Sequence, residues 1–131
     1  MKYDIRILNG IDIIRISRIK NIIEKFGDKF INRVFLPNEI KYCESRGNKA
    51  IHYAVRIAAK EAVAKALGTG ISKDISWKDI EVVNNDTGKP EVILHNEAKN
   101  VLKRMGGYDV SLSLSHEGNN AVAQVIILIK S

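Results

Sequence analysis

The segment that most constrains the fold is RIAAKEAVAKALGTGIS, residues 56–72, in which alanines surround four charged side chains and two glycines follow. Alanine is the strongest helix former, and a glycine such as Gly68 is typical of the residue that ends a helix. We therefore predict a long helix from an Asn48 cap to Gly68. An amphipathic helix does not require Thr69 and Gly70 to follow at once, and a glycine turn lets a ligand approach the backbone closely.

An N-terminal strand and three shorter helices are predicted before the long helix. The isoleucine-rich, partly alternating segment YDIRILNGID indicates a strand from Tyr3 to Asp12, which places Asp12 at the strand's end. Apolar residues then recur at helical spacing from the candidate cap Ser17. Gly27 ends the first of these helices, and Pro37 suits the first turn of the third. The three helices are predicted at residues 17–26, 28–35 and 37–46.

The second half of the chain alternates with the period of strands. The segments DIEVVNND and KPEVILH indicate a hairpin whose turn contains Gly88, and NEAKNVLKRMGG indicates a short helix from Asn96 to Gly106. A second strand pair, YDVSLSLSH and AVAQVIILI, flanks EGNN. The predicted order is β-α-α-α-α-β-β-α-β-β, an α+β fold with helices packed on an antiparallel sheet, in one domain over residues 1–131.

Composition narrows the class of protein. A formal net charge of +6 and a pI near 9.5 favour an anionic partner. The longest apolar run, 125–129, is far shorter than the ~20 residues of a membrane span, and the N-terminus lacks the pattern of a signal peptide. We therefore expect a cytoplasmic protein that binds no membrane. The single cysteine, Cys43, is interpreted as a small buried residue on a helix.

Asp12 and Glu61 are the candidate metal ligands. Carboxylates converging from a strand end and a helix are hard oxygen ligands that suit magnesium bound together with phosphates and waters. The alternatives are a solvated turn for Asp12 and an exposed ion pair with Lys65, four residues on, for Glu61.

Three basic residues of the same helix are candidates for anion binding. Lys65 lies one turn after Glu61, so both can face one ligand. Arg56 is a candidate for bidentate phosphate binding, whereas Lys60 is predicted to be solvated on another face.

Taken together, four segments resemble the holo-acyl-carrier-protein synthases, the small 4′-phosphopantetheinyl transferases. They are GIDIIRISRI, RIAAKEAVAKALGTGI, WKDIEVVNNDTGKP and SLSLSHEGNNAVAQVI, and together they cover nearly the whole chain. Ile57 stands where the family usually has phenylalanine, and Leu36 where it often has a capping threonine. Each segment alone is a weak signal, but their order and spacing are specific.

The resemblance implies transfer of 4′-phosphopantetheine from coenzyme A to a serine of apo-acyl carrier protein, in fatty acid biosynthesis, with release of adenosine 3′,5′-bisphosphate. It implies magnesium on Asp12 and Glu61, and catalytic roles for Glu61, Lys65 and His116. It also implies a homotrimer with sites between protomers. The residues that it implies for coenzyme A are Arg56, Lys65, Gly68, Thr69, Gly70, Gly88, Lys89, Pro90 and His116.

Plainer readings of these residues remain open at this point. Gly88, Lys89 and Pro90 also suit an ordinary hairpin turn, and a lone histidine at a strand end, such as His116, is usually a surface or capping residue. The basic segment after Asp12 also suits a solvated face. The resemblance makes it the docking surface for acidic acyl carrier protein, through Arg15, Arg18 and Lys25, with Arg18 first.

Two other functions fit parts of the sequence. The net charge permits a non-enzymatic nucleic-acid-binding module, but the chain has no recognisable binding motif and no interleaved aromatics, so we predict no nucleic-acid partner. The carboxylate pair also permits a divalent-metal nucleotide phosphohydrolase. Turnover of coenzyme A that depends on a carrier protein separates the transferase from both.

Overall fold

The computed structural model describes residues 4–130, and its element order is the predicted one. Tyr3, where the first strand was predicted to begin, lies outside the described residues. The first half contains β1 (Ile5–Arg15), α1 (Ile16–Phe26), α2 (Asp28–Val34), α3 (Pro37–Glu44) and α4 (Lys49–Ala66). After a 3₁₀ turn, η1 (Trp77–Asp79), come β2 (Ile80–Asn84), β3 (Pro90–Leu94), α5 (Asn96–Arg104), β4 (Gly107–Glu117) and β5 (Asn120–Lys130).

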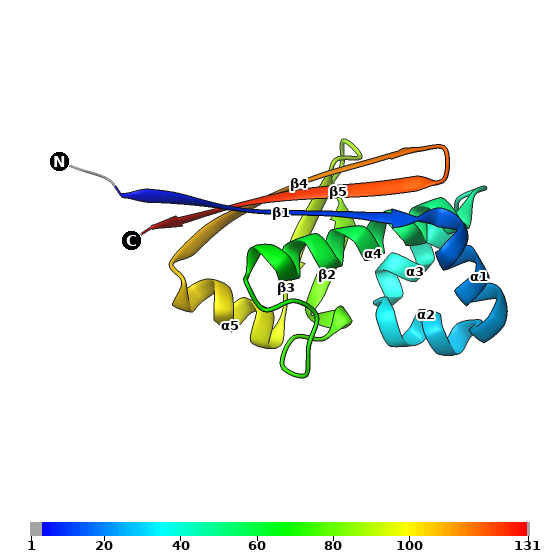
Figure 1. Ribbon diagram of the computed structural model, residues 1–131, viewed down its shortest axis with the longest axis horizontal. Coiled ribbons are helices and arrows are strands. Elements are labelled where there is room, and N and C mark those ends of the chain that lie inside the picture. Colours follow the sequence, from blue (N-terminus) through cyan, green and yellow to red (C-terminus); the bar gives the residue numbers. More distant parts are fainter. Residues whose placement is uncertain (1–3, 131) are drawn as a thin grey trace.

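The strands form two antiparallel sheets rather than one. In the larger sheet β5 lies between β1 and β4, and in the smaller one β2 pairs with β3. The helices lie on one side of the larger sheet, with α4 along it (Figure 1). The inward-facing residues of β5 pack in the same core cluster as the alanines of α4 or in the adjoining one. This confirms the predicted α+β architecture.

Gly10 lets α4 lie directly against β1. A Cβ atom at Gly10 would be 2.0 Å from the carbonyl oxygen of Ala62, so only glycine fits this contact. Asp12 follows two residues later, on the same face of the strand. The close approach of the two backbones therefore brings Asp12 to the side of α4.

The part of the opposite face that β1 forms is largely apolar and is uncovered in the single chain. Along β1, Ile7 is 66% exposed and Ile13 is 65% exposed, and they alternate with inward-facing residues. Tyr108 of β4 and Ile126 of β5 are also exposed. Scattered apolar residues are normal on a surface, but a contiguous row of isoleucines is typical of an interface. We call the face formed by Ile5, Ile7, Ile11, Ile13 and Ile126 the isoleucine face.

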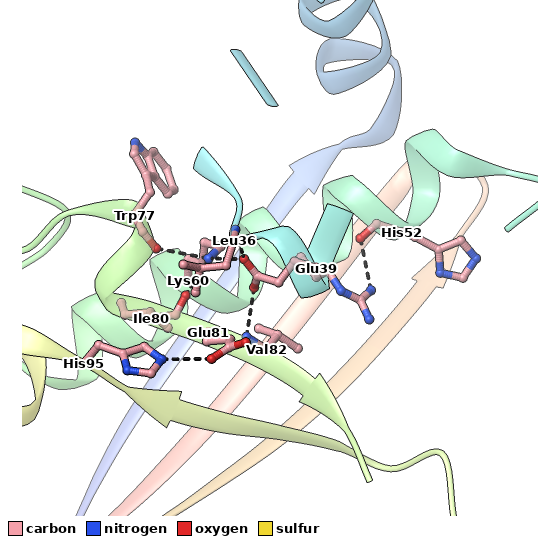
Figure 2. A network of polar contacts seen from close by, with 10 residues as sticks. Leu36, Glu39, His52, Lys60, Trp77, Ile80, Glu81, Val82 and His95 are labelled. Atoms are coloured by element: carbon pink, nitrogen blue, oxygen red, sulfur yellow. Dashed lines mark hydrogen bonds and ion pairs between the residues drawn. The ribbon is translucent and has the colours of Figure 1, made fainter. Parts of the chain in front are cut away.

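Lys60 is buried, which makes the prediction of a solvated side chain wrong. Its Nζ donates to Glu39 Oε1 at 2.9 Å, to the Trp77 carbonyl at 3.0 Å and to the Ile80 carbonyl (Figure 2). Glu39 in turn accepts hydrogen bonds from the backbone N–H groups of Leu36 and Val82. The pair, 0% exposed on both sides, ties α4 to the start of α3 and to β2.

Several predicted boundaries shift. The first strand continues past Asp12 to Arg15, which precedes α1, so Asp12 does not lie at the strand's end. Ser17 lies inside α1, where its Oγ accepts a hydrogen bond from Asn119. Neither Asn48 nor Asn96 caps a helix through its side chain, and α5 is preceded by His95. Polar residues near a boundary indicate a helix start, but tertiary contacts decide which one caps it.

The interpretation of Cys43 as a small buried residue is confirmed. Cys43 is fully buried on α3, and burial raises the pKa of its thiol to about 12, so it is inert. Among the described residues, no helix is both long enough and apolar enough to cross a bilayer.

Candidate active site

Asp12 and Lys65 meet where β1 passes α4. Lys65 Nζ donates to Asp12 Oδ1 at 2.8 Å and to the carbonyl of Ile11 at 3.2 Å. The Asp12 side chain is 17% exposed and that of Lys65 is 52% exposed, so the pair lies at the surface, open to a ligand. Hydrogen bonding to Asp12 raises the pKa of Lys65, which keeps this amine charged.

Glu61 lies beside this pair, on the same side of α4. It lines a cavity of about 390 Å³ together with Asp12 and Arg18. Partial burial, and then the charge of Asp12, raise the pKa of Glu61, whereas Lys65 and Arg18 act in the opposite direction. A carboxylate whose ionisation is disfavoured by burial and by a neighbouring carboxylate marks a place where positive charge is needed. The plain alternative, a Glu61–Lys65 ion pair, does not form, because Lys65 pairs with Asp12.

A second cavity, of about 210 Å³, contains Arg56 and His116. Arg56 is 2% exposed, and its guanidinium carbon lies 4.2 Å from the centre of the Tyr42 ring. Its Nη2 donates to Asn84 Oδ1 at 2.7 Å, and its Nη1 donates to the His52 carbonyl at 3.3 Å. Its Nε has no hydrogen-bond partner among the described residues. A buried cation with an unused donor suits an anionic ligand.

The two cavities lie at opposite edges of the larger sheet. Asp12 is on β1 and His116 is on β4, with β5 between them, and both residues have the strand parity that faces α4. Residues 56 and 61 are about 140° apart around a helix of 3.6 residues per turn. Glu61 and Arg56 therefore lie on different sides of α4. Within the described part of a single chain, the predicted residues do not form one site.

The remaining predicted ligands for coenzyme A lie on two exposed turns. Gly68 and Gly70, with φ of 82° and 62°, follow α4 on either side of Thr69. Gly88, with φ of 87°, and Lys89 lie in the turn before β3, whose first residue is Pro90. Of these residues Pro90 lines the second cavity, and the role of every one of them stays a prediction.

The predicted docking residues for a carrier protein are spread along α1. Arg15 immediately precedes the helix, and Arg18 lines the first cavity. Lys25 is in the last turn, where its Nζ lies 5.3 Å from the centre of the exposed Phe26 ring. The basic surface therefore begins at the carboxylates and extends along α1.

Comparison with known proteins identifies the family. The sequence model of the 4′-phosphopantetheinyl transferase superfamily matches residues 9–124. A holo-[acyl-carrier-protein] synthase of Geobacter sp. (strain M21) is 46% identical over 118 residues, which are 90% of this chain and 94% of that protein. The chain belongs to the holo-acyl-carrier-protein synthase family.

Solved structures of this family have the same fold. The Neisseria meningitidis synthase superposes with a TM-score of 0.84 at 36% identity, over 92% of this chain and 96% of that one. The Helicobacter pylori synthase, solved in complex with coenzyme A, has a TM-score of 0.80 at 32% identity, over 95% and 100% of the two chains. The resemblance expected from the four sequence segments is confirmed.

Three residues that line the second cavity and interact with Arg56 were not predicted from the sequence. They are Tyr42, His52 and Asn84. Asn84 belongs to the quoted segment WKDIEVVNNDTGKP, so an available signal was overlooked. Tyr42 lies on α3, and His52 lies one helical turn before Arg56. No local pattern distinguishes either residue, because the packing of α3 on α4 brings them together.

Proposed function

We propose that this chain is a magnesium-dependent cytoplasmic enzyme that transfers 4′-phosphopantetheine from coenzyme A to a serine of apo-acyl carrier protein. The products are the holo-carrier protein, used in fatty acid biosynthesis, and adenosine 3′,5′-bisphosphate. The observation that carries the proposal is the convergence of Asp12, Glu61 and Lys65 beside one cavity in a member of the synthase family. The Helicobacter pylori relative, which binds coenzyme A, supports the donor.

The residues present fit magnesium. Asp12 and Glu61 line the same cavity, and burial and then the charge of Asp12 raise the pKa of Glu61, which supports a cation beside the two carboxylates. The described residues contain no group of three or more histidine, cysteine or acidic side chains that could hold a metal. Magnesium suits a pair, since it usually takes one or two carboxylates and completes its shell with waters and substrate phosphates. When bound, it would neutralise charge on the pyrophosphate.

The side chains of this site have different roles in the transfer. The serine oxygen forms a bond to the phosphorus that carries pantetheine, and the bond from that phosphorus to the bridging oxygen breaks. Glu61, directly or through a water, is the proposed base that accepts the serine proton. Lys65, held by Asp12, offers positive charge to the phosphoryl oxygens.

The second cavity would hold another part of coenzyme A. Arg56, with its unused Nε donor, and His116 line this cavity and are suited to phosphate. The glycine turns at residues 68–70 and 88 would let the nucleotide approach the backbone. Lys89 in the second turn adds an exposed positive charge.

One donor molecule then has to reach both cavities, which supports a homotrimer. The isoleucine face is a ready contact surface, and closed rotational symmetry would repeat one contact around a ring. In such a ring, Asp12 and Glu61 of one protomer would complete a site with Arg56 and His116 of the next. The chain as a whole would act as one transferase domain.

The acidic carrier protein would approach along α1. Arg15, Arg18 and Lys25 give this helix a basic surface that begins at the first cavity. Such complementarity speeds encounter and weakens as salt rises. Arg18→Glu should therefore raise KM for the carrier protein at low salt and leave KM for coenzyme A nearly unchanged.

The decisive experiment is mass spectrometry of apo-acyl carrier protein incubated with coenzyme A, magnesium and the enzyme. The expected result is the mass increase of one phosphopantetheine group. Omission of magnesium, or a carrier protein whose acceptor serine is replaced by alanine, should abolish it. Hydrolysis of coenzyme A without modified carrier protein would instead identify a phosphohydrolase.

The shared site is tested by mixing subunits. Asp12→Ala and His116→Ala chains, each impaired alone, should regain activity in hybrid oligomers, because some interfaces then pair an intact Asp12 with an intact His116. Native mass spectrometry should show the trimer and the exchange. Failure to complement despite exchange would place both residues in one protomer's site.

A further inference from the structure

His52 belongs to the second cavity, although neither the chemistry of the transfer nor the sequence motifs call for it. Its ring meets the Tyr42 ring edge-on, with centroids 5.7 Å apart and planes at 78°, and it lines the cavity with Arg56 and His116. His52 also lies one turn before Arg56, and its carbonyl accepts a hydrogen bond from that guanidinium (Figure 2). The imidazole therefore lies against the Tyr42 ring and lines the cavity.

Three basic side chains lie near His52. Arg56 faces it from α4, His116 from β4 and Arg46 from the turn after α3. Both guanidinium groups lie close to the Tyr42 ring, whose centre is 4.2 Å from the carbon of Arg56 and 4.5 Å from that of Arg46. None of these arginines forms an ion pair with a carboxylate in the described part of the chain. So much unbalanced positive charge around one small cavity calls for a multiply charged anion.

We propose that His52 is a phosphate-binding residue of this cavity and that it takes up a proton when a phosphate group of coenzyme A enters. The inference rests on the proposed function, because it requires the donor's phosphate to occupy the cavity. A phosphate monoester, with a second pKa of about 6, carries close to two charges at neutral pH and has three acceptor oxygens. The Arg56 guanidinium and the His52 ring belong to residues that line the same cavity, and they could share those oxygens.

Electrostatics explain why His52 takes up a proton only when the ligand binds. Burial, and then the charges of Arg56, Arg46 and His116, lower the pKa of His52. The ring is therefore neutral in the free chain near pH 7. A dianion within hydrogen-bond distance reverses the sign of the local potential, which favours the imidazolium form. Binding and protonation are thus linked, and acid conditions favour binding.

The test measures binding rather than turnover. Isothermal titration calorimetry in two buffers of different ionisation enthalpy reports the protons taken up when coenzyme A binds. Wild-type protein should take up a fraction of a proton near pH 7, and His52→Gln should take up less. At about pH 6 the variant should bind about tenfold more weakly, as expected for loss of one charge-assisted hydrogen bond, and the gap should close by about pH 8.

Matched variants separate binding from structure. His95→Gln removes a histidine that lies outside the cavity, and it should keep both the affinity and the proton uptake of wild-type protein. Dephospho-coenzyme A, which lacks the 3′-phosphate, identifies the group: a loss confined to coenzyme A supports the 3′-phosphate, and equal losses with both donors support the pyrophosphate. Unchanged proton uptake in His52→Gln overturns the proposal, as does an affinity loss that is equal at every pH.

This test stands apart from the test of the proposed function. Wild-type protein that binds coenzyme A with linked proton uptake but modifies no carrier protein would defeat the transferase assignment and leave His52 as a phosphate ligand. Modification of the carrier protein, combined with wild-type proton uptake in His52→Gln, would support the transferase assignment and overturn the proposed role of His52.

Discussion

Two of the three lysines of helix α4, five residues apart, form ion pairs that look alike and act differently. Lys60 lies 2.9 Å from Glu39 and Lys65 lies 2.8 Å from Asp12. The first pair is 0% exposed on both sides, whereas the Lys65 side chain is 52% exposed. Distance therefore says little about what an ion pair does, and burial decides its role.

The environments explain the difference. Lys60 has three oxygen acceptors, one for each proton of an ammonium group, so it is charged although burial lowers its pKa. These bonds connect three elements, and a ligand cannot reach them. Lys65 donates to two oxygens, those of Asp12 and Ile11, and keeps one donor free beside the cavity that Asp12 lines. Loss of Lys60 should thus appear in stability, and loss of Lys65 in activity.

The largest effect is expected for Lys60→Met. It leaves the Glu39 carboxylate buried without its counter-charge, which typically costs about 3–5 kcal/mol of unfolding free energy. The matched control Lys65→Met should cost ~0–1 kcal/mol, because the pair is exposed. Urea unfolding followed by circular dichroism measures both. Equal stability of the two variants would show that the buried pair does not hold these elements together.

Asp12→Ala and Glu61→Ala test the proposed catalytic role of the site beside Lys65. Each removes a carboxylate from the proposed magnesium pair, and transfer should fall by a factor on the order of 100 or more. Their circular dichroism spectra should match that of wild-type protein. The measurement is holo-carrier protein formed over a magnesium titration. Near-native activity with unchanged magnesium dependence would remove that residue from the metal site.

Lys60 and Lys65 also show which features of the fold the sequence alone can predict. Periodicity and turn residues predicted all ten helices and strands in order, because those signals are local. Lys60 was wrongly predicted to be solvated, since a helical repeat gives the face of a residue but not what covers that face. Its partner Glu39 is 21 residues away, and only the packing of α3 and β2 on α4 brings them together. Similarly, β1 runs past Asp12 because β5 is long enough to pair with it up to Arg15.

The active-site residues likewise include some that the sequence predicted and some that it did not. Family motifs pointed to Asp12, Glu61 and Lys65, and their proximity in the structure supports those predictions without testing their roles. No motif pointed to Tyr42 or His52, whose position depends on how α3 lies against α4.

Glu61→Gln should separate activity from stability. The folded-state pKa of Glu61 is raised, so the native state holds its proton more tightly than the unfolded state, and stability is lost as pH rises through that pKa. At neutral pH the ionised carboxylate therefore destabilises the fold. Glu61→Gln should be inactive yet at least as stable as wild-type protein at pH 7, with the difference vanishing below the pKa of a normal glutamate. Unfolding measured across this pH range checks the sign, and a variant less stable at pH 7 would contradict it.

The smallest expected effect concerns salt, and it distinguishes the two lysines without reference to catalysis. The Debye length falls from about 10 Å at 0.1 M salt to about 3 Å at 1 M, so an exposed pair is screened and a buried one hardly at all. The stability lost in Lys65→Met, ~0–1 kcal/mol at low salt, should shrink toward zero at 1 M sodium chloride. The loss in Lys60→Met should stay the same within the error of the urea measurement, because no counter-ion reaches a pair that is 0% exposed. Equal salt dependence in both variants would mean that water reaches Lys60, and the contrast between the two lysines would then disappear.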